Sequence, residues 1–429
     1  MNESVFTYAA PGLKFGRGAS DEIGWDVRQL VATTGGSARR VLLVTDPGVA
    51  ATGHPGRIAA AMGSHGLDVT VFAGARVEPT DASMEEAIAF AREAGPFDAV
   101  VAVGGGSAID TAKAVNLLLT NAGSLMDYVN APVGGGRPPE QPLLPLVAVP
   151  TTTGTGAEST TICVLDVLAL KVKTGISHAR LRPTLAVVDP DLTMTQPAMV
   201  TASCGMDILC HALESWTARW FADFDAKQPE QRVPYCGANP IADLWSEKAM
   251  SLLAGAFRRA VRDGSDTEAR EEMALAATFA GLGFGNAGVH VPHACAYPIA
   301  GRVRDYRPAG YPDNAPIVPH GMAVVMTAPA AFALTFEASP ERHLRAAELL
   351  GGPSAAGSSG GADTLPTVLR GLMRDVGLPS GLAELGYGSA DVDDLVDGAL
   401  KQQRLLATAP IDVTADDLAT VFAGSLEHW

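Results

Sequence analysis

The chain has 429 residues, of which 47% are hydrophobic and 18% are charged. A chain of this length and composition has enough apolar side chains for a large core, divided into two or three domains, and is not intrinsically disordered. The formal net charge of −16 argues against nucleic acid and against an anionic membrane surface as partners, although an anionic small molecule can still bind at a locally basic site.

The cysteine content and the N-terminus bear on the compartment. The chain has five cysteines, an odd number without a C-x-x-C pair, which favours a reducing compartment over a disulfide framework. No basic stretch followed by an apolar run is present at the N-terminus. The longest uncharged apolar run, residues 322–334, is short for a membrane span and contains Pro329. The sequence therefore predicts a cytoplasmic protein without a membrane partner.

Apolar runs typical of buried strands alternate with helical patterns in the first half of the chain. The predicted helices cover residues 20–33, 53–65, 82–94 and 108–119, and the predicted strands cover 40–46, 67–74, 97–103, 144–150 and 184–189. Such alternation predicts an α/β domain with a mostly parallel, Rossmann-like sheet over residues 1–195.

The pattern changes between Pro190 and Pro197, after which few strand-like runs remain. The predicted helices of this second half cover residues 201–220, 241–262, 267–282, 322–334, 341–350, 364–376 and 414–422. An all-helical domain is therefore expected over residues 196–429. The Pro/Gly-rich segment 132–142 and the Ser/Gly/Ala-rich segment 354–361 are expected to be loops.

A glycine-rich turn follows the predicted strand 97–103. Gly104, Gly105 and Gly106 allow backbone N–H groups to approach a ligand closely, and the helix that begins behind them favours an anion. Ser107 is a candidate N-cap, with Asp110 three residues later in a capping-box arrangement. A cofactor pyrophosphate fits this position at the carboxyl end of a strand, although a purely structural glycine turn fits the same pattern.

Two further segments follow predicted strands. Asp46 can accept hydrogen bonds from ribose hydroxyls and would repel a 2′-phosphate, but it can equally initiate a turn before Pro47 and Gly48. Residues 150–158 form a hydroxyl-rich, glycine-containing loop. Loops of this type line nucleotide clefts, and they are also ordinary turns.

A candidate metal site begins with Asp207 and His211, which lie four residues apart in a stretch with helical apolar spacing. Side chains at i and i+4 share one helix face, so a carboxylate oxygen and an imidazole nitrogen can converge. His293 and His320 lie in apolar, glycine-flanked stretches and would complete a site with three nitrogens and one oxygen. His290 and, less strongly, Cys295 compete with them as ligands, and each histidine alone also fits a buried core residue.

These motifs, in this order, resemble the iron-dependent (group III) alcohol dehydrogenases along almost the whole chain. The resembling stretches are residues 6–10, 44–46, 104–113, 150–158, 189–192 and 205–214, with His293 and His320. The resemblance implies a dehydroquinate synthase-like architecture, in which an α/β dinucleotide domain precedes a helical metal- and substrate-binding domain. It also implies a homodimer or larger homo-oligomer, with the edge segment near residues 5–15 as a candidate contact.

The resemblance assigns roles to individual residues. The implied metal ligands are Asp207, His211, His293 and His320, and either Fe²⁺ or Zn²⁺ suits them. The implied cofactor contacts are Gly104, Gly105, Gly106, Ser107, Thr151, Thr152, Thr155 and Lys173. Asp46 takes the place of the acidic residue that favours NAD(H) over NADP(H).

One departure from the family pattern affects the catalytic residues. Many members carry a second histidine four residues after the third metal ligand, where this chain has Tyr297. Tyr297 and His290 are therefore the candidate catalytic side chains, and Tyr297 either relays a proton or only fills space. The long segment after His293 resembles the hydroxyacid-oxoacid transhydrogenase branch of the family. Its Arg302, Arg304 and Arg307 are candidate contacts for an acidic substrate, or else solvated loop charges.

The expected activity is metal-dependent hydride transfer between a nicotinamide cofactor and a small alcohol or aldehyde that bears an acidic group. A transhydrogenase or a 4-hydroxybutyrate dehydrogenase fits this description. The alternatives are an NADH-dependent reductase of phosphonoacetaldehyde or a similar acidic aldehyde, and a general primary-alcohol dehydrogenase.

Overall fold

The computed structural model describes residues 2–170, 172–311, 313, 315–354 and 360–429. The chain divides into two compact units. One unit is Ala10–Thr195, and the other consists of Gln196–Trp429 together with the N-terminal segment as far as Ala9. The interior of the loop predicted at 354–361 lies outside the described residues.

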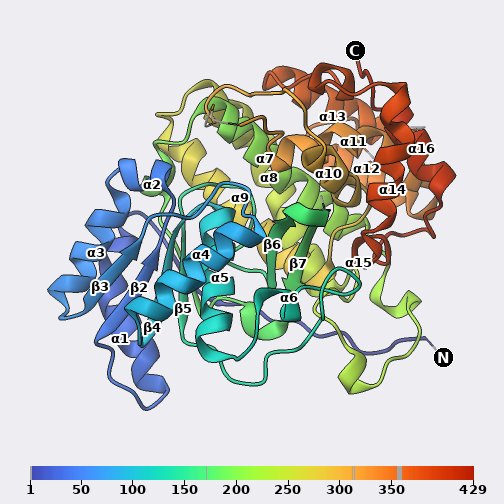
Figure 1. Ribbon diagram of the computed structural model, residues 1–429. Helices are drawn as coiled ribbons and strands as arrows, with labels where there is room; N and C mark the ends of the chain where they lie inside the picture. Colours follow the sequence, from blue (N-terminus) through green and yellow to red (C-terminus); the bar gives the residue numbers. More distant parts are fainter. Residues whose placement is uncertain (1, 171, 312, 314, 355–359) are drawn as a thin grey trace. The chain divides into compact units, whose positions relative to one another are not determined.

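The first unit contains a six-stranded sheet in which all neighbouring strands are parallel, in the order β1-β8-β5-β4-β2-β3 (Figure 1). The strands are β1 (Gly12–Phe15), β2 (Arg40–Val44), β3 (Asp68–Phe72), β4 (Ala99–Gly104), β5 (Leu146–Pro150) and β8 (Leu185–Val188). The helices are α1 (Ile23–Thr33), α2 (Pro47–Ala51), α3 (His54–Ser64), α4 (Asp81–Ala94), α5 (Gly106–Thr120) and α6 (Leu125–Tyr128). The expected parallel α/β architecture is confirmed.

Successive side chains of a strand point to opposite faces of the sheet, and β2 shows how this builds the core. Val41 and Leu43 are buried in the cluster formed with α1 and α3. Leu42 and Val44 are buried in the opposite cluster, formed with α4 and α5. Both faces are therefore covered, as the unbroken apolar strands predict.

Three strands, β1, β6 and β7, were not predicted. Strand β1 is short and lies at the edge of the sheet, where alternating burial is weak. A separate antiparallel hairpin joins β6 (Ile162–Val167) to β7 (Val172–Ser177). This hairpin follows the threonine-rich loop, and the mixture of polar and apolar residues in 151–183 has no clear period.

The second unit is a helical assembly, as expected. Its helices are α7 (Ala198–Thr217), α8 (Pro240–Arg262), α9 (Thr267–Ala287), α10 (Val291–Gly301), α11 (His320–Thr335), α12 (Pro340–Leu349), α13 (Thr364–Asp375), α14 (Val392–Leu400), α15 (Gln403–Leu406) and α16 (Ala415–Ala423). Short 3-10 turns complete the two units: η1 (Ala19–Glu22), η2 (Leu168–Leu170), η3 (Ala179–Leu181), η4 (Pro190–Thr193), η5 (Phe221–Asp223), η6 (Pro229–Gln231), η7 (Phe336–Ala338), η8 (Leu382–Leu385) and η9 (Ser389–Asp391). Helices α10, α14 and α15 were not predicted.

One helical stretch among the described residues, His320–Ala338, is long and apolar enough to cross a membrane. The adjoining helices α9 and α10 pass the same test only as a pair bent by 103°. In His320–Ala338, 72% of the apolar window is buried inside the protein. Burial of this extent is typical of a central core helix in a globular unit.

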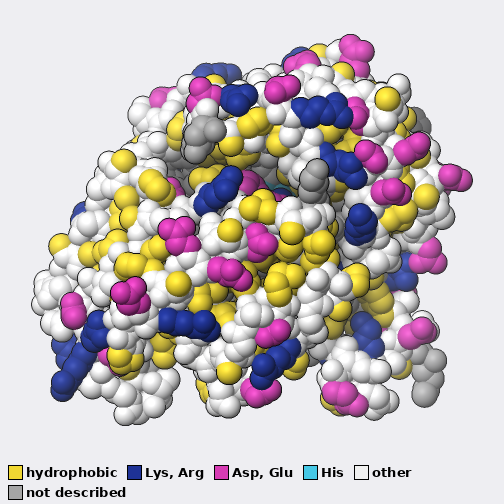
Figure 2. Space-filling model, viewed as in Figure 1, with side chains coloured by type: hydrophobic (Ala, Val, Ile, Leu, Met, Phe, Trp, Pro, Cys, Tyr) yellow, Lys and Arg dark blue, Asp and Glu magenta, His cyan; other side chains and the backbone are white. Residues whose placement is uncertain are grey.

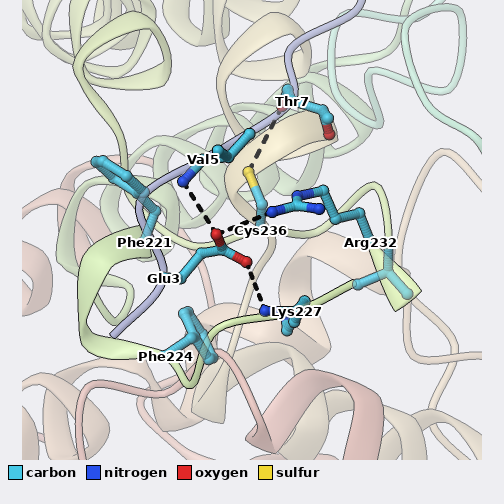
Figure 3. Close-up of a pocket in the computed structure, with 9 residues that line it drawn as sticks. Glu3, Val5, Thr7, Phe221, Phe224, Lys227, Arg232 and Cys236 are labelled. Atoms are coloured by element: carbon cyan, nitrogen blue, oxygen red, sulfur yellow. Dashed lines mark hydrogen bonds and ion pairs between the residues drawn. The ribbon is translucent and has the colours of Figure 1, made fainter. Parts of the chain in front are cut away.

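Residues 2–9 belong to the helical unit and not, as the predicted boundary at residue 195 implies, to the α/β unit. Their attachment centres on Glu3 (Figure 3). Its backbone N–H donates to Phe224 O, and its carboxylate accepts from the N–H groups of Val5 and Lys227 and from Arg232. This attachment depends on hydrogen bonds to one buried carboxylate, so hydrophobic periodicity does not reveal it.

The Glu3 anchor predicts a pH-dependent contribution to stability. The N–H groups of Val5, Lys227 and Ser4 and the Arg232 guanidinium lower the pKa of Glu3 from 4.5 to about 2, against the opposing effect of burial. A lowered folded-state pKa means that the stabilisation is complete above pH 4.5 and disappears as the pH falls toward 2. Glu3→Gln should therefore lower the midpoint of urea unfolding at pH 6. The difference in midpoint between the variant and wild type should become steadily smaller below pH 4.5. A gap that is independent of pH would contradict this role.

The surface charges are interspersed and not segregated on the face displayed in Figure 2, where acidic and basic side chains alternate with apolar ones. Many of the described arginines have carboxylate partners at the surface, such as Arg258 with Asp375 and Arg345 with Glu247. The net charge of the chain is therefore not gathered into one acidic patch on this face.

Candidate active site

Four side chains from three helices of the second unit converge on one point. Asp207 and His211 come from α7, His293 from α10, and His320 is the first residue of α11. One ligand atom from each lies within 4.8 Å of all the others. Asp207 Oδ1 is 3.6 Å from His293 Nε2, 3.7 Å from His211 Nε2 and 3.8 Å from His320 Nε2. The structure thus brings together the four residues singled out in the sequence.

Close helix packing makes this convergence possible. A Cβ at Gly321 would lie 2.1 Å from Ser203 O and 2.7 Å from the Asp207 Cβ, so only glycine allows the start of α11 to approach α7 this closely. Gly288, with φ +98°, ends α9 and turns the chain into α10. These two glycines place His320 and His293 beside the Asp207/His211 face of α7.

The cluster fits a divalent metal ion. Asp207 Oδ1 and His293 Nε2 are buried and lack a hydrogen-bond partner among the described residues. Orphaned buried polar atoms are costly unless a ligand satisfies them. Three imidazoles and one carboxylate form a donor set that suits Zn²⁺ and Fe²⁺, so a bound cation accounts for both atoms.

The electrostatics of the cluster are consistent with this fit. Burial lowers the pKa of His211 to about 3, so its imidazole is neutral and available as a ligand. Burial also opposes charge on His293, but Glu214 and Asp207 outweigh it and raise its pKa to about 9. Burial alone would raise the pKa of Asp207, yet the three surrounding histidines hold it below its ordinary value. The surroundings of His293 therefore favour positive charge at the centre of the cluster.

Glu214 supports the cluster from behind and was not recognised as a site residue in the sequence. Its side chain is fully buried and accepts from the backbone N–H groups of His290 (2.8 Å) and His293 (3.1 Å) and from His293 Nδ1. A carboxylate on the far nitrogen fixes the tautomer of a ligating histidine and turns its Nε2 toward the metal. Glu214 lies seven residues after Asp207, two helical turns along the same face of α7, and that spacing was the available signal.

Two competing ligands lie outside the cluster. His290 is fully buried, its Nε2 is 3.0 Å from Thr217 Oγ1, and burial lowers its pKa to about 4. Cys295 is also fully buried, and burial holds the pKa of its thiol well above the ordinary value. Neither joins the four residues that share a centre. His290 is a core histidine in this structure, while Tyr297 lies one turn beyond His293 on α10 and is 8% exposed.

The three candidate substrate arginines do not converge. Arg302 pairs with Asp394, Arg304 with Asp391, and Arg307 with Asp313. All three side chains are exposed, and each has its own carboxylate. Their arrangement is that of solvated surface ion pairs, because a single anion cannot contact three guanidinium groups that point to separate partners.

The predicted nucleotide loops meet within the α/β unit. Gly105 and Gly106 lie against the threonine loop, since a Cβ on them would be 3.1 Å from Thr152 Oγ1 and 2.8 Å from Thr155 Oγ1. Thr151 N–H donates to Gly104 O at 3.1 Å, and the buried Thr151 Oγ1 has no hydrogen-bond partner among the described residues. The ends of β4 and β5 therefore form one polar surface at the carboxyl edge of the sheet, where open α/β folds bind ligands.

Asp46 lies at the same edge. Its Oδ1 caps α2 by accepting from Val49 N–H, and its Oδ2 would be 3.3 Å from a Cβ at Gly104. The capping role and the position beside the glycine loop both hold, so the turn-forming and ribose-binding interpretations of Asp46 are compatible.

One sequence expectation in this unit needs correction. Helix α5 begins at Gly106 with Gly105 as its N-cap, so Ser107 and Asp110 do not form a capping box. Ser107 Oγ instead accepts from Glu78 N–H, and Asp110 accepts from Val164 N–H. Lys173 is buried between Glu78 (2.5 Å) and Asp166 (3.1 Å). Its ammonium group is therefore paired within the protein, and the expected contact of Lys173 to the cofactor stays a prediction.

The tight approach of the two loops predicts the effect of one added methyl group. Gly106→Ala places a Cβ 2.8 Å from Thr155 Oγ1 and forces the threonine loop to move. We expect this variant to weaken NADH binding about tenfold or more, equivalent to ~1.4 kcal/mol, as measured by NADH fluorescence titration. Gly63→Ala is the matched control, because nothing lies within 4 Å of a Cβ at that position in α3. Equal NADH affinity in both variants would contradict the role of the Gly106 loop.

The chain combines a parallel sheet covered on both faces, with a glycine loop at its carboxyl edge, and a buried cluster of three histidines and one aspartate. These features together define a metal-dependent, nucleotide-using enzyme. Comparison with protein families agrees: the model for iron-containing alcohol dehydrogenase matches residues 11–190, and that for the C-terminal domain of the same family matches 230–426. The chain belongs to the iron-containing alcohol dehydrogenase family and is a metal-dependent alcohol oxidoreductase.

Individual relatives extend this result. The mitochondrial hydroxyacid-oxoacid transhydrogenases of Rattus norvegicus and Homo sapiens are each 43% identical to the chain, over 99% of it and 90% of their own length. A crystal structure of 1,3-propanediol oxidoreductase superposes with a TM-score of 0.84 at 30% identity, covering 98% of this chain and 100% of that one. The sulfoacetaldehyde reductase of Bifidobacterium kashiwanohense in complex with NAD⁺ gives 0.79 at 27% identity, covering 99% of each chain.

The relatives correct the expected location. Similar curated proteins are mitochondrial by name, which contradicts the cytoplasmic prediction. Unpaired cysteines argue only against oxidising compartments, so the composition of the chain does not separate the cytosol from another reducing compartment.

Proposed function

We propose that the enzyme transfers a hydride between a small hydroxyacid and an oxoacid through a nicotinamide cofactor, with one divalent metal, Fe²⁺ or Zn²⁺, held by Asp207, His211, His293 and His320. The single observation that carries the metal chemistry is the pair of orphaned buried atoms, Asp207 Oδ1 and His293 Nε2. The choice of substrates is supported by the full-length similarity to hydroxyacid-oxoacid transhydrogenases.

The bound groups supply the reactive chemistry. When bound, a divalent ion held by the cluster would supply Lewis acidity toward a substrate oxygen, and a nicotinamide would supply the hydride chemistry. Oxidation of the hydroxyacid releases a hydride and the hydroxyl proton, and reduction of the oxoacid takes up both, so no net oxidant is consumed.

The residues of the chain hold and orient these groups. Glu214 holds His293 with its Nε2 toward the cluster. Phe284 stacks on His211 with ring centroids 3.8 Å apart and fixes the plane of that imidazole. Tyr297, one turn beyond His293, is the side chain we assign to the substrate proton.

We propose NAD(H) in preference to NADP(H) as the cofactor. Gly104, Gly105, Gly106 and Ser107 would receive its pyrophosphate, and Thr151, Thr152 and Thr155 would line its nicotinamide side. Asp46 at the end of β2 offers a carboxylate oxygen beside the glycine loop. A carboxylate in this position accepts from ribose hydroxyls and repels a 2′-phosphate. The complex of sulfoacetaldehyde reductase with NAD⁺ supports the same choice. A homodimer or larger homo-oligomer is the proposed assembly, with the edge segment near residues 5–15 as its candidate contact.

The deciding experiment supplies 4-hydroxybutyrate and 2-oxoglutarate to metal-loaded enzyme without added nucleotide. A transhydrogenase with retained cofactor forms succinic semialdehyde and 2-hydroxyglutarate in equal amounts.

The second candidate, an NADH-dependent reductase of a short acidic aldehyde, is favoured by the similarity to sulfoacetaldehyde reductase. It would give no turnover until NADH is added, and would then consume NADH with the aldehyde alone. Oxidation of neutral primary alcohols in preference to both acids would instead indicate a general alcohol dehydrogenase.

A further inference from the structure

A substrate that carries a carboxylate needs a cation to receive it. The arginines of the segment after α10 are each paired with a surface carboxylate. A different arginine of the helical unit, Arg404 on α15, has no such partner. No carboxylate among the described residues lies within 4 Å of its guanidinium group, in contrast to Arg302, Arg304 and Arg307.

The guanidinium group of Arg404 lies over the ring of Tyr235, 5.1 Å from the ring centroid. Its Nη1 is shielded from solvent and has no hydrogen-bond partner in the described parts of the chain. A charged N–H group in this situation is costly to leave unsatisfied. Stacking on an aromatic face leaves the planar donor edge available to a carboxylate.

The side chains around Arg404 pack against the segment that leads to the metal ligand His293. A Cβ on Gly288 would lie 3.2 Å from the Tyr235 ring and 3.1 Å from Thr408 Cγ2, so both side chains press on this glycine. Thr408 Oγ1 also donates to Val289 O at 2.7 Å. Helix α15 itself packs on α10, the helix that carries His293. Arg404 is thus fixed to the element that positions one side of the metal cluster.

We infer that Arg404 binds the carboxylate of the hydroxyacid and oxoacid substrates through its free donor edge, and so selects acidic over neutral alcohols. This inference rests on the proposed function, since only an acidic substrate has a carboxylate to bind. A guanidinium and a carboxylate match in a bidentate geometry that lysine does not reproduce.

The test compares an acidic substrate with a neutral one of the same carbon number. In Arg404→Gln, KM for 4-hydroxybutyrate should rise about 10- to 100-fold, while kcat/KM for 1-butanol should change less than twofold. Arg404→Lys, which keeps the charge, should recover part of the loss. Adding millimolar guanidinium ion should restore the activity of the Arg404→Ala variant on 4-hydroxybutyrate. A readout without turnover is calorimetric binding of succinate, which should weaken in parallel.

Arg345→Gln is the matched control, because Arg345 is an exposed arginine already paired with Glu247 and Glu348. It should leave both substrates unaffected. If Arg404→Gln and Arg404→Lys lower activity on acid and alcohol equally and lower Tm together, Arg404 is only a packing residue and the inference is wrong. If the wild-type enzyme oxidises 1-butanol but not hydroxyacids, the proposed function itself is wrong. This outcome is seen in the wild type alone and is therefore distinct from a failure of the Arg404 inference, which is seen in the variants.

Discussion

Replacing Asp207 by asparagine is expected to abolish tight metal binding and to lower kcat/KM about 1,000-fold, equivalent to ~4 kcal/mol. The physical reason is that Asp207 supplies the only anionic oxygen among the four clustered residues, and all three imidazoles lie within 3.8 Å of its Oδ1. Metal content of the purified protein and activity after reconstitution with Fe²⁺ or Zn²⁺ measure the effect.

The control for this prediction is Asp243→Asn, which makes the same chemical change in a carboxylate that pairs with Arg342 and lies outside the cluster. Thermal unfolding provides a second readout. Added Zn²⁺ should raise the Tm of metal-free wild type and of Asp243→Asn, because a ligand that binds only the folded state stabilises it. It should leave the Tm of Asp207→Asn unchanged. Retention of one metal per chain by Asp207→Asn would show that the cluster is not the metal site.

Replacing Glu214 by glutamine is expected to weaken metal affinity about 10- to 100-fold without emptying the site at high metal concentration. Glutamine keeps an oxygen for the N–H groups of His290 and His293 but removes the negative charge that holds the proton on His293 Nδ1. Competition with a chelator of known affinity measures the change directly.

Two comparisons separate this positioning role from a general loss of stability. Ser215→Ala removes a neighbouring buried side chain that bonds Ser246 Oγ, and it should leave metal affinity unchanged. Activity of Glu214→Gln should recover when metal is supplied in large excess, whereas Asp207→Asn should not recover. Unchanged chelator competition in Glu214→Gln would mean that its contact to His293 does not govern the metal site.

Periodicity was sufficient for the central strands of the sheet and for the long helices. Strands β2, β4 and β5 are unbroken apolar runs, and burial on both faces of a parallel sheet is the physical reason for that pattern. Helices α7, α8 and α9 were likewise evident from their apolar spacing. Helix α10 was missed because its residues are apolar on every side, with Pro292 and Pro298 inside, so no period distinguishes it from a loop.

Side-chain contacts between segments that are distant in the chain could not be predicted from the sequence. Lys173 pairs with Glu78, which lies 95 positions away in the chain, and no local pattern indicates this pair. His290 competed with His293 as a ligand in the sequence, and only the fold turns His293 toward Asp207 and His290 toward Thr217. Such contacts depend on the direction in which each segment leaves its helix, which local sequence does not encode.

What the sequence determined by itself is the order of the elements and the identity of the groups that carry the chemistry: the glycine turn, Asp207 with His211 one turn apart, and two later histidines. These are local properties, set by backbone freedom and by helical spacing. Only the tertiary structure decided that His320 joins the cluster, that Glu214 supports it, and that Arg404 retains a free guanidinium edge. Those outcomes depend on close packing between helices, as at Gly321 and Gly288, where a single added carbon would keep the segments apart.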